Sequence, residues 1–195
     1  RSGMRVVIDL QGAQSTSSRN RGIGRYSTSL IKAMLEARGE RDVHLLLNGA
    51  FANTLDPIRL EFKGLLPAEN IHVWHPATPT CAADPDNAFR RKASAQIRES
   101  VIARLAADIV LISSLFEGFG DDAVLSIGEF ASNIPTVVVM YDLIPLIHDH
   151  IYMVNSLFEK WYRQQVDQIR RATHLLSISA SSGMEAVTYL GFPER

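Results

Sequence analysis

Arg5-Val6-Val7-Ile8-Asp9-Leu10, near the start of the chain, is a short run rich in β-branched residues. Continuously apolar runs of this length are typical of strands that are buried on both faces, as in a parallel sheet. Further runs of the same kind follow at residues 43–48, 71–74, 108–113, 135–141 and 174–179. We therefore expect six strands in one sheet that is covered on both sides.

Segments with apolar residues at three- or four-residue spacing separate the strands, and this spacing predicts helices. We expect helices from residue 22 to near 39, over 88–107, over 156–172 and over 182–190, the last capped by Ser181. Residues 50–66 are ambiguous and favour a helix interrupted by Pro57. Alternating strands and helices predict an α/β fold with a doubly wound, mostly parallel sheet and helices on both faces. Ligands of such sheets bind beyond the carboxyl ends of the strands.

The composition is that of an ordinary folded domain, with 195 residues, 46% hydrophobic and 21% charged. A net charge of −1 argues against a nucleic-acid partner, which requires a strongly basic face. The single cysteine, Cys81, excludes an intrachain disulfide and a thiolate metal cluster. No apolar run reaches the roughly 18 residues that a membrane span needs.

Residues 1–3 precede Met4 and resemble a cloning scar, so we expect a single domain over residues 4–195. These first residues are too few and too polar for a signal peptide. The final residues, 192–195, read as the start of a linker toward a further domain. We expect a cytoplasmic location, with attachment to the inner face of the membrane left open.

Two glycines, Gly22 and Gly24, open the first long helix and are followed by Arg25. A helix N-terminus presents free N–H groups and partial positive charge, and glycine lets a ligand approach the backbone closely. The functional interpretation is a site for a diphosphate or a sugar hydroxyl, and the structural alternative is a tight entry into the helix. A dinucleotide fingerprint is disfavoured, because the loop after Leu10 is too long and the second strand ends in Asn48 rather than an acid.

Tyr141 and Asp142 end the strand over residues 135–141. A carboxylate at the carboxyl end of a strand can accept hydroxyl hydrogen bonds or orient a base, whereas the structural alternative is a cap on the following turn. Beyond them, His148 and His150 have no third ligand at a telling spacing, so no metal site is expected.

An acidic loop follows the strand over residues 108–113 and carries Glu117, Asp121 and Asp122. Its carboxylates suit sugar hydroxyls, and the neighbouring Phe116 and Phe119 suit sugar faces. The alternative is a solvated acidic loop with no ligand.

The order of these motifs resembles the N-terminal half of GT-B glycosyltransferases, specifically the retaining group 1 family, glycosyltransferase family 4. This family includes many bacterial mannosyltransferases of polysaccharide assembly. The resemblance runs from Met4 to the end of the chain, and no single motif decides it. It rests on residues 5–12 with Gly22-Ile23-Gly24-Arg25-Tyr26-Ser27, on Ser113-Ser114-Leu115-Phe116-Glu117-Gly118, on Tyr141-Asp142-Leu143-Ile144-Pro145-Leu146 and on Ser177-Ile178-Ser179-Ala180-Ser181-Ser182.

The resemblance implies the acceptor-side, Rossmann-like domain of a two-domain enzyme whose own C-terminal, donor-binding domain is absent here, so the isolated chain should be inactive. The full-length enzyme would transfer a sugar from a nucleotide-sugar donor to a glycan or lipid-linked acceptor with retention, using no metal or other cofactor. Mannose from GDP-mannose is the expected donor.

The family also implies roles for individual residues. Asp142 would be catalytic. Tyr141 stands where relatives often carry a histidine that helps to hold the donor sugar, and it would contact the donor through its hydroxyl. The glycines at 22 and 24 would approach the donor diphosphate, Arg25 would contact phosphate, and the loop from Glu117 to Asp122 would face the acceptor. A stand-alone sugar- or nucleotide-binding module without catalysis is the competing hypothesis.

Overall fold

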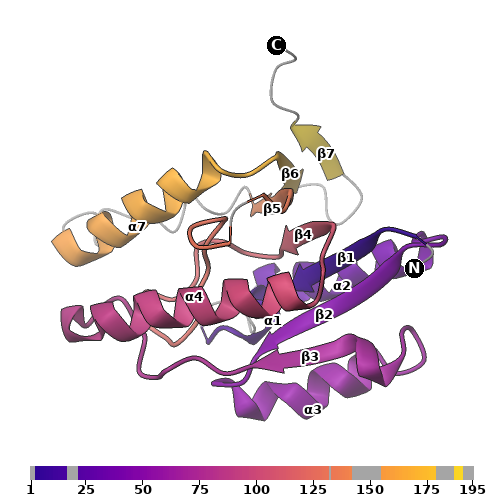
Figure 1. Cartoon of the computed structure of the whole chain (residues 1–195), viewed down its shortest axis with the longest axis horizontal. Helices are drawn as coiled ribbons and strands as arrows, with labels where there is room; N and C mark the ends of the chain where they lie inside the picture. Colours follow the sequence, from indigo (N-terminus) through magenta and orange to yellow (C-terminus); the bar gives the residue numbers. More distant parts are fainter. Residues whose placement is uncertain (1–2, 17–21, 132, 142–154, 179–186, 191–195) are drawn as a thin grey trace.

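The computed structural model describes residues 3–16, 22–131, 133–141, 155–178 and 187–190. Its centre is a seven-stranded sheet in the order β3-β2-β1-β4-β5-β6-β7 (Figure 1). The first six strands of the chain run parallel, and β7 pairs antiparallel with β6. The strands are β1 (Arg5–Asp9), β2 (Asp42–Asn48), β3 (Ile71–Trp74), β4 (Ile109–Ile112), β5 (Thr136–Tyr141), β6 (His174–Ile178) and β7 (Val187–Leu190).

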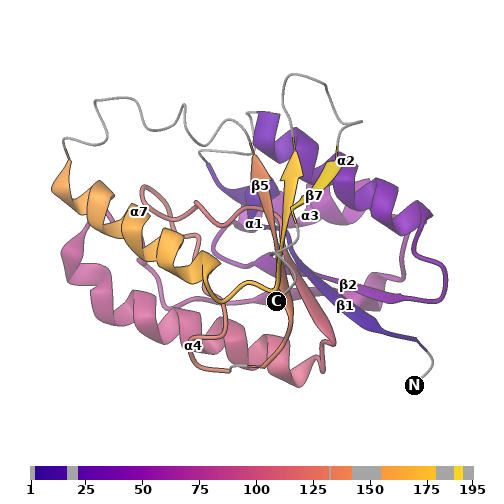
Figure 2. The ribbon, with the colours of Figure 1, turned by 90° about the horizontal axis from the view of Figure 1, so that it is seen from above.

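Helices cover both faces of this sheet (Figure 2). On one face lie α2 (Gly22–Glu36) and α3 (Ala52–Glu61), and on the other lie α4 (Ala88–Arg104) and α7 (Ser156–Ile169). A short helix, α1 (Gln11–Gln14), connects β1 toward α2, and 3-10 turns occupy Ala68–Asn70 and Pro85–Asn87. The predicted doubly wound α/β fold is therefore confirmed.

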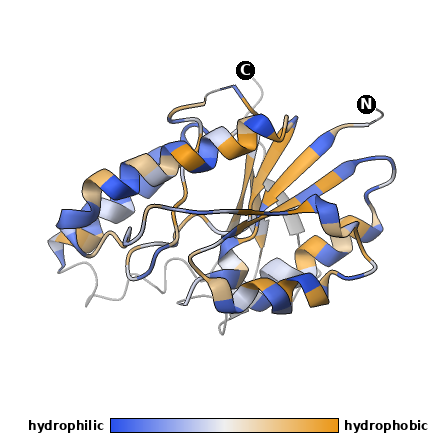
Figure 3. Cartoon of the chain, turned by 60° about the horizontal axis from the view of Figure 1, so that its bottom comes forward, coloured by the Kyte–Doolittle hydropathy of each residue, from blue (hydrophilic) through white to orange (hydrophobic). Residues whose placement is uncertain are grey.

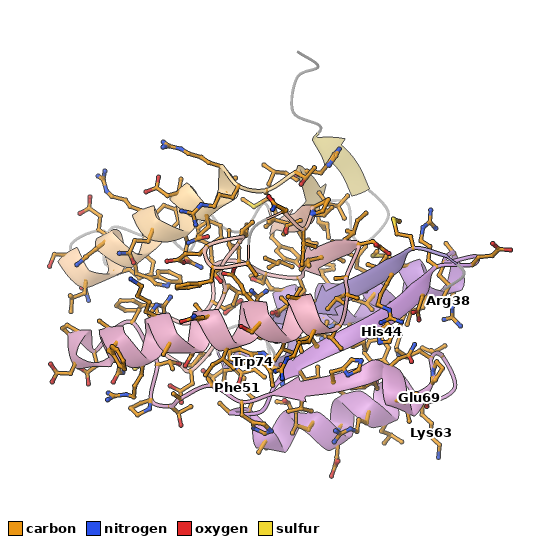
Figure 4. All side chains as sticks on the ribbon, viewed as in Figure 1. Arg38, His44, Phe51, Lys63, Glu69 and Trp74 are labelled. Atoms are coloured by element: carbon orange, nitrogen blue, oxygen red, sulfur yellow. The ribbon has the colours of Figure 1, made fainter. Side chains whose placement is uncertain are left out.

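The core has two layers, one on each side of the sheet, and this is why the strands read as continuously apolar. Val6 and Ile8 of β1 pack with Leu30 of α2, whereas Val7 packs with Ile102 of α4 on the opposite face. Successive side chains of a strand point to opposite faces of the sheet. Because helices cover both faces, the side chains on both are apolar. Figure 3 shows the strands mostly in the hydrophobic colour and the helices with mixed faces. Phe51 and Trp74 lie together beneath α4, at the carboxyl ends of β2 and β3 (Figure 4).

The structure corrects three predicted elements. The last helix expected over residues 182–190 is wrong for its second half, where Val187–Leu190 form β7 on the edge of β6. The segment from Val187 to Leu190 contains β-branched and aromatic residues that suit an edge strand, and pairing overrides the helical spacing. Pro57 lies inside α3 instead of interrupting it. The predicted helix over 88–107 ends at Arg104, because Ala106 adopts a left-handed conformation with φ 56°.

Candidate functional site

The switch point of the sheet lies between β1 and β4, where Asp9 pairs with Ile112. The strand order runs from β1 outward in both directions, and α/β sheets bind ligands beyond the carboxyl ends of the strands at such a point. Polar side chains gather there although they are buried: Ser15, Ser27, Ser113, Ser114 and Glu117. Buried polar groups are costly unless they are paired, so the members of this cluster need hydrogen-bond partners.

Gly12 of α1 lies where α1, α2 and the loop after β4 meet. A Cβ added to Gly12 would lie 2.8 Å from Ser114 Cβ, 3.0 Å from Ser27 Oγ and 3.1 Å from Ser113 Oγ. The Gly12 N–H donates a hydrogen bond to Ser113 Oγ at 3.2 Å. The backbone therefore approaches the serines as closely as glycine alone permits. Gly12 was not among the predicted site residues, although a glycine shortly after a buried strand was the available signal.

The carboxylate of Glu117 is buried and holds two segments together. Ser15 Oγ lies 2.7 Å from Glu117 Oε2, and Ser114 Oγ donates to Oε1 at 2.9 Å. Glu117 therefore joins α1's C-terminal end to the loop that follows β4. The alternative of a solvated acidic loop is wrong for this residue, because its side chain is almost fully removed from water.

Asp121 shares Ser15 with Glu117. Its Oδ2 atom lies 2.6 Å from Ser15 Oγ and accepts the Thr16 N–H at 3.0 Å, while Oδ1 accepts the Ala123 N–H at 3.1 Å. A hydroxyl has one proton, so Ser15 can donate to only one of the two carboxylates at a time. The structure thus brings Glu117 and Asp121 together around a single serine.

Asp122 points toward a different neighbour. Its Oδ1 atom accepts the Thr80 N–H at 2.8 Å, and its carbonyl oxygen accepts a hydrogen bond from Asn48 Nδ2 at 3.0 Å. Asp122 thereby attaches the acidic loop to the end of β2 and to the segment after β3. Its position at the carboxyl edge agrees with the expected location, and its assignment to an acceptor stays a prediction.

Tyr141 ends β5 with its ring in the core and its hydroxyl 2.8 Å from Ser27 Oγ of α2. Burial raises the pKa of the Tyr141 phenol, and the Ser27 hydrogen bond only partly opposes this effect. The phenol is therefore neutral at physiological pH. The expected sugar contact of Tyr141 stays a prediction, and the structure adds that its hydroxyl already has a protein partner.

Gly22 and Gly24 form part of the first turn of α2 itself rather than a separate turn before it. Gly24 is buried, its carbonyl oxygen accepts Thr28 Oγ1 at 3.2 Å, and Arg25 is exposed. Since α2 is 15 residues long, its N-terminal end carries the full partial charge of a helix. Asp142 lies outside the described residues, as do His148 and His150.

A buried ion pair joins α4 to the carboxyl end of β1, next to the switch point. Arg98 Nε of α4 donates to Asp9 Oδ2 at 2.7 Å, and both side chains are 1% exposed. Arg98 Nη1 also donates to the Ser126 carbonyl at 2.9 Å. An acidic residue inside an otherwise apolar first strand was the sequence signal for this pair, but its partner is 89 residues away and could not be read from it.

Amide side chains extend this network to β2. Gln11 Nε2 donates to the Val124 carbonyl at 2.8 Å, and its Oε1 accepts both the Val124 N–H and Asn48 Nδ2, each at 2.9 Å. Gln14 in turn accepts the Asn48 N–H at 2.8 Å and donates to Thr54 Oγ1 at 3.0 Å. The ends of β1 and β2 and the acidic loop are thus one hydrogen-bonded unit.

In the part of the chain that the structure describes, no group of three or more His, Cys, Asp or Glu side chains is arranged to hold a metal ion. None of the helices there combines the length and apolar character needed to cross a membrane.

Three curated proteins of Escherichia coli, each named "Serotype-specific mannosyltransferase WbdA", are similar to this chain. The first is 34% identical over 189 residues, which is 95% of the chain. The others are 33% and 32% identical over 84% and 82% of the chain. The chain spans only 22%, 20% and 20% of the length of these relatives. No family model and no solved structure matches it. The similarity over nearly the whole chain identifies it as a homologue of one segment of these glycosyltransferases.

Proposed function

We propose that this chain is the acceptor-side domain of a GT-B glycosyltransferase of family 4, which transfers mannose from a nucleotide-sugar donor to a glycan or lipid-linked acceptor with retention. The similarity to proteins named mannosyltransferases, over 95% of the chain, is the observation that carries this proposal. The doubly wound sheet with a polar cluster at its switch point supports it, because such sheets bind their ligands there.

The donor diphosphate would meet the first turn of α2. The N–H groups of the first turn have no acceptor within the helix, and together with the exposed guanidinium of Arg25 they suit a phosphate group. Departure of a nucleoside diphosphate builds negative charge, and fixed dipoles and cations aimed at that charge lower the barrier. A domain beyond this chain would supply most of the donor contacts, so the isolated chain would not turn over.

The acceptor would lie against the acidic loop, with Asp142 as the catalytic group at the end of β5. In this arrangement Glu117 acts as a positioning residue, since its two carboxylate oxygens already contact Ser15 and Ser114. Asp121 and Asp122 are partly exposed and are the carboxylates of this loop that acceptor hydroxyls would reach. Tyr141 would hold α2 in place against the end of β5 through its hydrogen bond with Ser27.

The test is a transfer assay on the native-length protein with radiolabelled GDP-mannose, and with UDP-glucose as the control donor. We expect mannose transfer with retained anomeric configuration, undiminished by a metal chelator, and none from this chain alone. Arg25→Ala should raise the donor KM about ten- to a hundredfold, the value of one hydrogen bond to a charged group.

Arg41→Ala is the matched control for Arg25→Ala, because Arg41 is an exposed arginine just before β2, at the opposite edge of the sheet. Equal donor KM values for the two variants would remove Arg25 from the donor site. Saturable donor or glycan binding with no transfer by the native-length protein would favour a binding module instead.

A further inference from the structure

Two adjoining pockets lie between α4 and α7, on the face of the sheet opposite α2. The larger has a volume of about 400 Å³ and the smaller about 190 Å³, and both are lined by Ala88, Arg91 and Gln164. We call this pair of pockets the α4/α7 groove. Figures 1 and 2 show the two helices on the same face, and residues 124–126 contribute to the lining between them.

The lining of the α4/α7 groove mixes both signs of charge with side-chain amides. Its charged and amide residues are Asp84, Asn87, Arg91, Lys92, Glu129, Lys160, Gln164, Gln165, Asp167, Gln168 and Arg171. A phosphate or an acidic polymer would be attracted by the cations but repelled by Glu129 and Asp167. A neutral polyhydroxylated ligand uses donors and acceptors alike, so this lining fits a sugar chain better than an anion.

Several of these polar groups are held in place by the backbone of neighbouring loops. Gln165 is buried and donates to the Leu115 carbonyl at 2.7 Å, and Gln168 Oε1 accepts the Ile127 N–H at 2.9 Å. Arg91 Nη1 donates to the carbonyls of Gly118 at 3.1 Å and Thr80 at 3.4 Å. Polar groups that are fixed before binding lose less entropy when a ligand arrives.

Gln164 differs from these anchored residues, because it is exposed and its amide makes no hydrogen bond to another described residue. It stands at the point where the two pockets join. The smaller pocket also includes Trp161, whose ring lies 5.4 Å from that of Phe158 and 5.8 Å from that of Phe119. Trp161 is only 5% exposed, but its buried indole N–H has no hydrogen-bond partner among the described residues. An unpaired donor near the amide of Gln164 suits the hydroxyl groups of a sugar.

The groove is connected to the candidate site through one glycine. Gly118 follows Glu117 directly, and its carbonyl accepts the Arg91 hydrogen bond. Gly118 has φ 102°, and a Cβ there would lie 2.1 Å from the Ala123 carbonyl oxygen. The acidic loop therefore presents Glu117 toward the switch point and its Gly118 carbonyl toward the α4/α7 groove.

We propose that the α4/α7 groove binds a neutral oligosaccharide, namely the part of the acceptor glycan that lies away from its reacting end. The inference rests on the proposed function for the choice of glycan. It assigns a second contact region for the acceptor, separated from the switch point by the acidic loop. The acceptor would then be held in the groove through sugars that do not themselves react.

The test is a titration of the ¹⁵N-labelled chain with mannotetraose, followed by NMR. The reporters for the groove are the side-chain amide of Gln164, the Arg91 Nε–H and the Trp161 indole N–H. The reporters for the switch point are the backbone N–H groups of Gly12 and Ser27. We expect saturable shifts in the groove reporters, and Gln164→Leu should weaken binding about two- to tenfold, the value of one hydrogen bond.

Gln96→Leu is the matched control, because Gln96 is an exposed glutamine of α4 that does not line either pocket. Unchanged binding in Gln96→Leu and weaker binding in Gln164→Leu support the proposal. An equal dissociation constant for Gln164→Leu and the unmodified chain would overturn it. Inorganic pyrophosphate that moves the groove reporters at lower concentration than mannotetraose would overturn the neutral class of ligand.

The two sets of reporters separate this inference from the proposed function. Shifts at Gly12 and Ser27 without shifts in the groove would leave the switch point as the acceptor site and overturn the groove. Saturable shifts in the groove together with no mannose transfer by the native-length protein would support the groove as a glycan site and contradict the proposed function. No shift at either place would overturn the groove, while the transfer assay would still decide the proposed function.

Discussion

Tyr141 Oη lies 2.8 Å from Ser27 Oγ, and this hydrogen bond joins the carboxyl end of β5 to α2 across 114 residues of sequence. Both side chains are buried, so neither hydroxyl can exchange its partner for water. The position of α2's first turns, and hence of Gly22 and Gly24, depends on this contact together with the packing around Gly12.

Tyr141→Phe should lower the free energy of unfolding by about 1 kcal/mol, because the ring stays in place while Ser27 loses its buried partner. Urea denaturation measures the change. Tyr26→Phe is the control, because Tyr26 of α2 has no hydrogen bond through its hydroxyl to another described residue, and it should change stability by less than about 0.5 kcal/mol. Equal effects in the two variants would mean that the Tyr141 hydrogen bond contributes nothing.

Gly12→Ala should lower the free energy of unfolding by about 1–3 kcal/mol, since the new Cβ would lie 2.8 Å from Ser114 Cβ and the neighbours must move. The control is Gly120→Ala, because a Cβ at Gly120 meets nothing within 4 Å. Thermal unfolding of both variants checks the difference. A Gly12→Ala protein as stable as Gly120→Ala would show that the three serines have room to retreat.

Arg98→Met should lower the free energy of unfolding by about 3–5 kcal/mol, because it leaves the Asp9 carboxylate buried without its counter-ion. Arg163→Met removes an exposed pair with Glu159 on α7 and should cost about 0.5 kcal/mol or less. Chemical denaturation of both variants makes the comparison. Gln11 also donates to Asp9, from its backbone N–H to Oδ1 and from Nε2 to Oδ2, each at 3.0 Å. A small loss for Arg98→Met would indicate that these hydrogen bonds from Gln11 are enough for the buried carboxylate.

Acidification should destabilise the protein through His72. Burial lowers the pKa of His72 below its ordinary value of 6.5, and the charges of His44 and Arg5 act in the same direction. The unfolded chain therefore binds this proton more readily than the folded one. The contribution of neutral His72 to the free energy of unfolding is complete above about pH 6.5, and it is lost as pH falls toward the lowered pKa of the folded state.

His72→Gln should flatten the dependence of the unfolding free energy on pH between about 7 and 5. The ring nitrogens His44 Nδ1 and His72 Nε2 lie 2.8 Å apart, so protonating both rings would place two charges in contact. An NMR titration of His72 should give a pKa below 6.5. A titration at or above the ordinary value, or an unchanged slope in His72→Gln, would contradict this account.

Asp42 should act at lower pH. Hydrogen bonds and charges from Arg5 and His44 outweigh burial and hold the pKa of this carboxyl below its ordinary value of 3.8. Its stabilising contribution is therefore complete above that value and is lost as pH falls through the lowered pKa. In Asp42→Asn, the free energy of unfolding should no longer fall with the protonation of residue 42 at low pH. Its dependence on pH above about 5, which His72 causes, should remain. Urea denaturation at several pH values therefore separates the two groups.

Periodicity along the chain determined which segments form strands and helices. The run from Val6 to Ile8 is apolar at every position because both faces of the sheet are covered, and that pattern is visible without any partner. The placement of the acidic loop at the carboxyl edge followed from the same reasoning. Local spacing failed at residues 187–190, where an antiparallel partner, β6, decided the outcome.

The tertiary structure alone decided how the polar residues pair. Nothing in the sequence near Glu117 indicates that Ser15, 102 residues away, completes its hydrogen bonds. The same holds for Asp9 with Arg98 and for the close approach at Gly12. Hydrophobic periodicity is a local property that each segment carries by itself, whereas the partner of a buried polar group depends on which segments the fold brings together.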